Sequence, residues 1–207
     1  MLAMPRLACP EEARGTLHVV QSGRARSVCF SCVGDRVEYL RALRECAECE
    51  QCAVHAYALM GNHVHLLFTA ARAAGAARLM PAIVERYARH LATAYAHTDP
   101  VWEEGYDASP VHARRHLLAC MRYIEENPVR AGLAAHPGAY PWSSYRANAL
   151  GEDDALVTPH AHYCSLARSP DARRAAYAAL FARAGDGITP VSRRPSLSLS
   201  PRARSRS

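Results

Sequence analysis

The sequence contains no lysine, and all 25 of its basic residues are arginine, against 19 acidic residues. Every side-chain cation other than histidine is therefore a planar guanidinium, which can hold a phosphate through two parallel hydrogen bonds. Residues 186–207 carry five arginines and one aspartate, which is +4 of the formal net charge of +6. The rest of the chain is nearly balanced, so net charge alone does not establish a nucleic-acid partner.

Long apolar runs are absent as well. No stretch of 18 or more apolar residues occurs, which argues against a membrane-spanning helix. The first residues lack the charged and then apolar pattern of a secretory signal. We therefore expect a cytoplasmic protein, with a domain at 1–150, a helical extension at 151–184 and an Arg/Ser/Pro-rich tail at 185–207. The tail has no periodicity, and we expect it to be disordered.

The hydrophobic pattern is that of a mixed α and β protein. We expect strands at 16–21, at 54–59, from 63 onward and at 106–111, and helices starting near 35, at 74–97 and at 113–126. Asp35 can cap the first helix, and Pro128 is expected to end the third. Gly61-Asn62 favours a tight turn, so the second and third strands form a hairpin. After Thr158-Pro159 a further helical region is expected, interrupted at Ser169-Pro170.

The strand after this turn begins Asn62-His63-Val64-His65. Side chains alternate along a strand, so His63 and His65 share one face while Val64, Leu66 and Phe68 point into a core on the other. Two neighbouring imidazoles can hold a metal ion. They can equally be ordinary histidines that satisfy local hydrogen bonds, and the spacing alone does not decide between the two. We expect His18 and His55 to be structural.

On the third helix, Tyr123 and Asn127 are four residues apart and share a face. A tyrosine hydroxyl can attack a phosphodiester when a cation polarises the phosphate, and the Asn127 carbonyl oxygen could be a further ligand. The residues alone leave open that Tyr123 is a core tyrosine.

The eight cysteines offer a competing hypothesis. Cys29-x2-Cys32 and Cys46-x2-Cys49, followed by Cys52, approximate the spacing of a zinc site in a nucleic-acid-binding module. The thirteen residues between the pairs are predicted to form a helix about 15–20 Å long, which would hold the pairs apart. Free thiols in a reducing compartment are the alternative.

Three motifs in order resemble one family: HAYALMGNHVHLLFT (55–69), LLACMRYIEENPVRAGL (117–133) and YPWSSYRANALG (140–151). They are similar to the transposases of single-strand-DNA insertion sequences, especially the REP-associated tyrosine transposases, and the similarity runs from about 4 to 184. The resemblance implies an α+β fold, a ferredoxin-like antiparallel sheet with helices packed on it, and a tyrosine transposase domain at 1–150.

The resemblance also implies the chemistry. Tyr123 would be the nucleophile, and His63, His65 and Asn127 would bind a divalent metal ion, Mg²⁺ or Mn²⁺. The protein would cleave and rejoin single-stranded DNA near hairpins of palindromic repeats through a 5′-phosphotyrosine, as a monomer or homodimer. A protein that only binds such hairpins, having lost cleavage, is the main alternative.

Four arginines are candidate DNA contacts: Arg24, Arg26, Arg122 and Arg130. Arg122 and Arg130 could equally pair with Glu125, Glu126 or a helix end. The segment 101–111 departs from the family, since Glu104 and Asp107 stand where many members are more basic, which puts the path of the DNA in doubt.

Overall fold

The computed structural model describes residues 15–72 and 74–182. The first part is a βαββαβ unit made of β1 (Thr16–Ser22), α1 (Val33–Cys49), β2 (Cys52–Leu59), β3 (His63–Ala70), α2 (Gly75–Tyr95) and β4 (Asp107–Pro110). The second part is helical and consists of α3 (Arg114–Arg130), α4 (Ala161–Cys164) and α5 (Pro170–Ala182), with the short turns η1 (Arg24–Arg26), η2 (Pro137–Ala139) and η3 (Arg146–Leu150).

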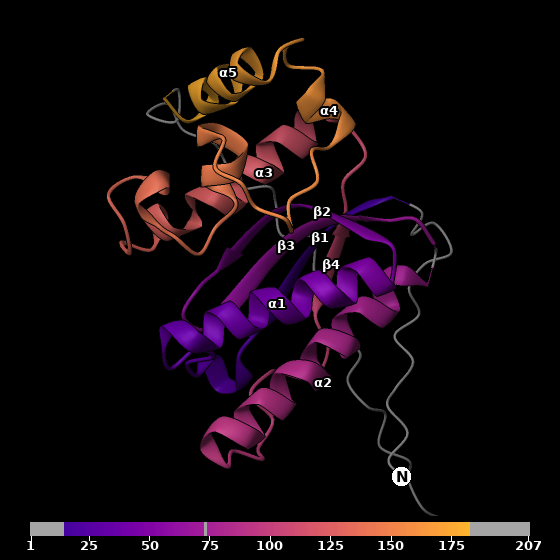
Figure 1. Cartoon of the computed structure of the whole chain (residues 1–207), viewed down its shortest axis with the longest axis vertical. Coiled ribbons are helices and arrows are strands. Elements are labelled where there is room, and N and C mark those ends of the chain that lie inside the picture. Colours follow the sequence, from indigo (N-terminus) through magenta and orange to yellow (C-terminus); the bar gives the residue numbers. More distant parts are fainter. Residues whose placement is uncertain (1–14, 73, 183–207) are drawn as a thin grey trace, which may run out of the picture.

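The four strands form one sheet in the order β2-β3-β1-β4, and every neighbouring pair is antiparallel. This is the ferredoxin-like α+β arrangement expected from the sequence, with β3 in the interior of the sheet. Helices α1 and α2 cover one face, and α3 and the helices after it lie on the other (Figure 1). The sheet is therefore a layer between two groups of helices.

Strand alternation divides the buried residues into two cores. Val64, Leu66 and Phe68 are fully buried and pack with α1 and α2, as their alternation predicted. The opposite face of the sheet packs on α3, through Leu67 of β3 and a row of apolar residues on the helix, Leu117, Met121 and Ile124. Since both faces are covered, the register of β3 decides which side chains meet α3.

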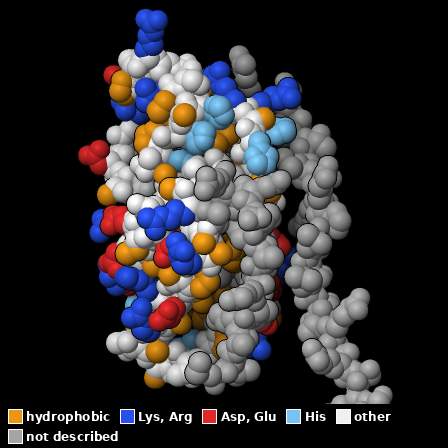
Figure 2. All heavy atoms as spheres, turned by 90° about the vertical axis from the view of Figure 1, so that its right-hand side faces the viewer, with side chains coloured by type: hydrophobic (Ala, Val, Ile, Leu, Met, Phe, Trp, Pro, Cys, Tyr) orange, Lys and Arg blue, Asp and Glu red, His pale blue; other side chains and the backbone are white. Residues whose placement is uncertain are grey.

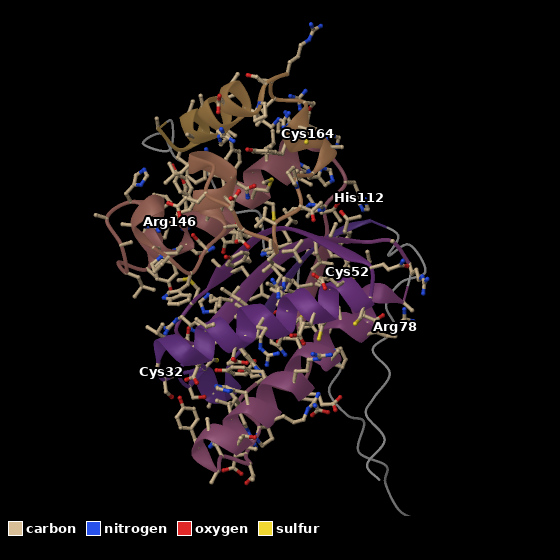
Figure 3. The ribbon with its side chains drawn as sticks, in the orientation of Figure 1. Cys32, Cys52, Arg78, His112, Arg146 and Cys164 are labelled. Atoms are coloured by element: carbon tan, nitrogen blue, oxygen red, sulfur yellow. The ribbon has the colours of Figure 1, made fainter. Side chains whose placement is uncertain are left out.

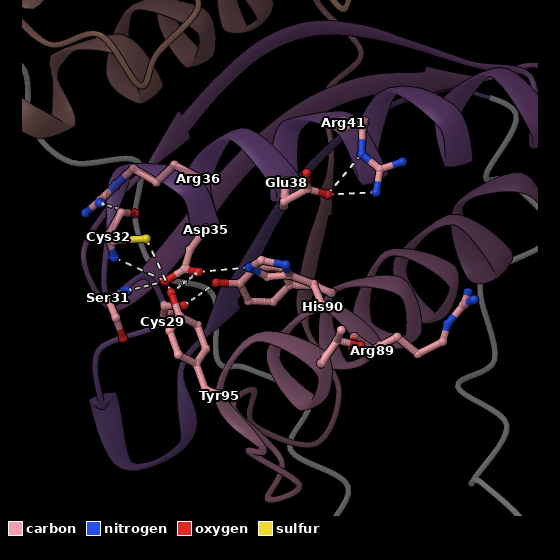
Figure 4. A network of polar contacts seen from close by, with 12 residues as sticks. Cys29, Ser31, Cys32, Asp35, Arg36, Glu38, Arg41, Arg89, His90 and Tyr95 are labelled. Atoms are coloured by element: carbon pink, nitrogen blue, oxygen red, sulfur yellow. Dashed lines mark hydrogen bonds and ion pairs between the residues drawn. The ribbon is translucent and has the colours of Figure 1, made fainter.

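The start of α1 differs from the expectation. The residue before the helix is Cys32, and Asp35 lies three residues further on, inside the first turn. The Asp35 carboxylate accepts hydrogen bonds from the backbone N–H groups of Ser31 (2.7 Å) and Cys32 (3.1 Å), and from the side chains of His90 and Tyr95 (Figure 4). Asp35 therefore stabilises the helix start from within and joins α1 to α2.

The end of α3 corrects a second expectation, because the helix continues through Pro128 to Arg130. Pro128 is buried, and the residues after it still form helix-end bonds, from Ala131 N to Asn127 O (2.9 Å) and from Leu133 N to Pro128 O (2.8 Å). Packing and these bonds outweigh the local preference of a residue before proline. Asn127 therefore belongs to the helix.

A buried carboxylate joins α3 to the helices that follow. Glu125 is fully buried, and its side chain accepts hydrogen bonds from Ser144 (2.6 Å), Asn148 (2.8 Å) and Tyr177 (2.7 Å). The expected helical region after Thr158 is present as α4 and α5, with a break before Pro170. The tail at 185–207 lies outside the described residues. In residues 15–72 and 74–182, no helix is long and apolar enough to cross a bilayer.

Candidate active site

The two histidines of the His-x-His motif project from β3 toward α3. His63 pairs with Ser22 and His65 with Val20 of β1, so the interior position of β3 fixes both backbones on two sides. Their ring centroids are 5.0 Å apart and the ring planes are nearly perpendicular, at 81°. His65 is buried and His63 is partly buried, so the pair lies where the sheet meets solvent.

Helix α3 places Tyr123 against this pair. The ring of Tyr123 meets that of His65 edge-on, with centroids 5.7 Å apart. The neighbouring Met121 and Ile124 are buried in the core, which fixes the rotation of the helix and leaves Tyr123 37% exposed. A core tyrosine, the alternative left open by the sequence, would be covered. Tyr123 instead combines a fixed ring with access from solvent.

Asn127 lies one turn after Tyr123 on the same helix. Its amide Nδ2 donates to the backbone carbonyl of Tyr123 at 2.8 Å, which leaves the carbonyl oxygen Oδ1 as the atom that could bind a cation. No hydrogen bond from Asn127 to His63 or His65 occurs among the described contacts. The structure therefore brings His63, His65 and Tyr123 together directly and places Asn127 beside Tyr123.

His18 is a site residue that the sequence reasoning missed. Its Nε2 lies 3.1 Å from Nδ1 of His65, the two rings stack with centroids 5.3 Å apart, and the Tyr123 ring lies 6.1 Å away. A histidine within the apolar strand β1, where it is half-buried, was the available signal. It could not be used without the pairing of β1 and β3, because His18 and His65 are 47 residues apart. His55, by contrast, bonds Thr69 and the carbonyl of Thr158, as a structural histidine would.

A second partner holds His63. The Nδ1 of His63 lies 2.7 Å from the Oδ1 of Asn62, an oxygen that can only accept, so Nδ1 carries the proton and Nε2 has the free lone pair. Histidine ligands of metal ions commonly donate their second N–H to such an acceptor. Asn62 and His18 therefore fix the two imidazoles in the manner of an outer shell around a metal site.

Burial favours the neutral form of all three imidazoles. Burial lowers the pKa of His18 to about 4. Burial also lowers the pKa of His65 well below its usual value, helped by its histidine neighbours. For His63, burial and then the positive charge of Arg26 lower the pKa. Neutral imidazole is the form that binds a metal ion, so the donor set fits a cation held by His63 and His65.

The four candidate arginines divide into two groups. The guanidinium of Arg130 lies over the Tyr123 ring, 5.5 Å from its centroid. Arg24 and Arg26 are exposed on η1, close enough to His63 for the charge of Arg26 to act on it. Arg122 is only 12% exposed, pairs with Glu126 and donates to the carbonyl of Leu180 at 2.9 Å. Packing of α5 on α3 accounts for Arg122 better than a phosphate contact does.

The cysteines do not assemble a zinc site in the described part of the chain. Cys32 and Cys52 lie at opposite ends of α1 (Figure 3), and Cys29 and Cys46 are buried in the core. Across residues 15–72 and 74–182, no group of three or more His, Cys, Asp or Glu side chains could hold a metal ion. The helix between the two pairs separates them, as its predicted length indicated.

The face of the described residues drawn in Figure 2 carries charges of both signs. On the face drawn in Figure 2, acidic and basic side chains are interspersed, while histidines gather above them. Several arginines of α2 are held in ion pairs, Arg78 with Glu50, Arg86 with Glu45 and Arg89 with Glu85.

Comparison with known proteins gives two findings. A solved structure of a REP-associated tyrosine transposase bound to a REP hairpin superimposes with a TM-score of 0.56 at 16% identity, over 71% of this chain and 87% of that one. This likeness shows the shared fold. A provisionally assigned transposase of Deinococcus radiodurans R1 has a TM-score of 0.40 at 23% identity, over 54% of this chain and 88% of that one, and carries no argument.

Among curated proteins, none matches the chain significantly. The family model described as "Transposase IS200 like" matches residues 13–127. The matched segment is more than half of the 207 residues and contains His18, His63, His65, Tyr123 and Asn127. The chain therefore belongs to the IS200-like transposase family.

Proposed function

We propose that this chain cleaves and rejoins single-stranded DNA beside a hairpin, with Tyr123 as the nucleophile and a divalent cation, Mg²⁺ or Mn²⁺, held by His63, His65 and Asn127. The observation that carries the proposal is the position of the exposed Tyr123 ring, edge-on to His65 at 5.7 Å. A nucleophile must reach the same phosphate as the metal ion, and a cation held by His65 beside Tyr123 would meet this requirement.

The residues of the chain would hold the cation through Nε2 of His63, Nε2 of His65 and Oδ1 of Asn127. When bound, the cation would polarise the phosphate and stabilise the charge that develops on it. Asn62 and His18 hold the two imidazoles by their other ring nitrogens. Imidazole and amide donors are compatible with Mn²⁺ and, less strongly, with Mg²⁺.

In the proposed step, the Tyr123 hydroxyl oxygen forms a bond to phosphorus and the bond from phosphorus to the 3′ oxygen breaks. The tyrosine gives up its proton and the leaving oxygen gains one, so the products are a 5′-phosphotyrosine and a free 3′-hydroxyl. One phosphodiester replaces another, which keeps the bond energy for rejoining. A second 3′-hydroxyl reverses the step and transfers the strand.

The proposed substrate is a hairpin with single-stranded flanks. The family and the hairpin held by the structurally similar transposase support this choice. Arg130 over the Tyr123 ring and Arg26 beside His63 bring positive charge to two edges of the site, where a phosphate backbone would enter. Both are guanidiniums, which bind phosphate bidentately.

The test is formation of a covalent adduct. End-labelled hairpins from repeats around the gene would be incubated with wild-type protein, with Mn²⁺, Mg²⁺ or chelator, and resolved on a denaturing gel. We expect a metal-dependent adduct that Tyr123→Phe abolishes. Tyr95→Phe is the matched control, because Tyr95 is the other strongly exposed tyrosine, at 48%, and lies on α2. It should leave the adduct unchanged.

Two other outcomes would replace the proposal. Hairpin binding without an adduct in either metal would establish the binding-only alternative. An adduct that survives Tyr123→Phe would assign the nucleophile to a different residue.

A further inference from the structure

We infer that a hollow beside His63 binds one unpaired base of the DNA strand next to the scissile phosphate. This inference rests on the proposed function and names a specificity pocket for it. The hollow has a volume of ≈ 340 Å³, near the lower end of small-molecule sites and enough for one flat heterocycle. His63 forms part of its wall, so the hollow and the candidate active site are continuous.

Three segments distant in sequence build the hollow. They are the end of η1 and the loop after it, with Arg26 and Val28, the β2–β3 turn at 60–62, and the residues that follow α3, including Leu133. Val28 is 68% exposed and Leu133 is 53% exposed, although both are large aliphatic residues. A single exposed aliphatic side chain is ordinary. Two such side chains from separate segments, at one hollow beside the proposed cleavage site, form an apolar surface that a base can contact.

The hollow is held in shape without a ligand. Backbone hydrogen bonds tie the loop to the turn, from Gly23 N to Asn62 O (2.8 Å) and from Cys29 N to Gly61 O (2.8 Å). Ala25 and Arg26 are held in the left-handed region, at φ 51° and φ 58°, which is unfavourable for residues with a Cβ and persists only where the surroundings impose it. Such preorganisation reduces the entropy lost when a base enters.

The charge at the hollow suits a nucleotide. Arg26 belongs to the wall of the hollow together with His63, and it is exposed. An apolar wall with an arginine at its edge can take the face of a base and the phosphate attached to it. Arg26 and His63 both line the hollow, so a base bound there with its phosphate at Arg26 would lie close to the proposed cleavage position.

The test combines DNA and protein variants. Hairpins would carry an abasic site at one flanking nucleotide at a time, and their dissociation constants would be measured by fluorescence anisotropy in chelator. For wild-type protein we expect one position where the abasic change weakens binding by about tenfold. Leu133→Ser should weaken binding of the intact hairpin by a similar factor. In the hairpin with that abasic site, Leu133→Ser should weaken binding little further. Val28→Ser should behave in the same way and replaces Leu133→Ser if that variant does not fold.

The matched control is Leu150→Ser. Leu150 has the same exposure as Leu133, 53%, but belongs to η3 and not to the hollow. In the Leu150→Ser protein, the abasic site should still weaken hairpin binding by the full factor of about ten.

The inference is overturned if no abasic position is coupled to Leu133 and Val28, or if the two variants change only the oligomeric state. Because binding is measured in chelator, these outcomes are separate from failure of the adduct assay. If the hairpin binds and one abasic position is coupled to Leu133 and Val28, but no adduct forms, the base pocket is supported and cleavage is rejected. No hairpin binding at all would reject both.

Discussion

His18 and His65 are joined across two neighbouring strands, with His18 Nε2 3.1 Å from His65 Nδ1. The contact fixes the orientation of the His65 ring and occupies the nitrogen that a metal ion would not use. His18 is therefore a positioning residue for the proposed cation site, and it lies close to Tyr123 without being a ligand itself.

Removing His18 is expected to weaken cation binding. His18→Ala should lower the affinity for Mn²⁺ by about ten- to a hundredfold, the usual effect of losing an outer-shell partner of a ligating histidine. Titration calorimetry with Mn²⁺ measures this directly, and hairpin affinity in chelator should stay within about twofold. His112→Ala, at an exposed histidine between β4 and α3, is the control. An unchanged Mn²⁺ affinity in His18→Ala would leave His18 with a packing role only.

The arginines near the site are expected to determine the salt dependence of DNA binding. Arg26→Ala and Arg130→Ala should each reduce the slope of log affinity against log salt by about 1, because each removes one phosphate contact. Arg41→Ala is the comparison, since Arg41 is already paired with Glu38 (2.7 Å) and Glu45 (2.8 Å) on α1. If Arg41→Ala lowers the slope as much as the other two substitutions do, the DNA does not bind specifically beside Arg26 and Arg130.

The Asp35 network is expected to make stability fall in acid. Burial raises the pKa of the Asp35 carboxyl, but hydrogen bonds from His90, Tyr95 and the backbone of Ser31 and Cys32 outweigh it, so the folded pKa is lower than usual. The ionised group then stabilises the fold at pH above its unfolded value of about 4, and this contribution is lost as pH falls through the folded pKa.

Asp35→Asn should therefore destabilise the protein by about 1–3 kcal/mol at pH 7 and by less at pH 3. Urea unfolding at a series of pH values gives both numbers. A difference between the variant and wild type that does not shrink in acid would show that the carboxylate charge is not the source of the stabilisation.

The hydroxyl of Tyr177 is expected to matter for stability, whereas that of Tyr123 is not. Tyr177→Phe removes a donor from the buried Glu125 carboxylate and should cost about 1–3 kcal/mol. Tyr123→Phe changes an exposed hydroxyl and should stay within about 0.5 kcal/mol. Thermal unfolding of both variants provides the comparison, and equal losses would mean that the Glu125 contact does not join α5 to α3 in solution.

Local patterns were sufficient where a residue's neighbours in sequence decide its structure. The hairpin of β2 and β3 follows from alternating residues around Gly61-Asn62, and this alternation already put His63 and His65 on one face. Pro128 shows the limit of such reasoning. A residue before proline disfavours helical geometry, but burial of Pro128 and the hydrogen bonds after it accompany a helix α3 that continues to Arg130.

The sequence by itself determined the family, the α+β class and the residues that carry the proposed chemistry, because these depend on residue type and short spacing. Only the tertiary structure decided that His18 contacts His65, that Arg122 bonds α5, and that Val28 and Leu133 line one hollow with His63. The physical reason is distance along the chain. Contacts between residues tens of positions apart depend on strand order and helix packing, which no local pattern specifies.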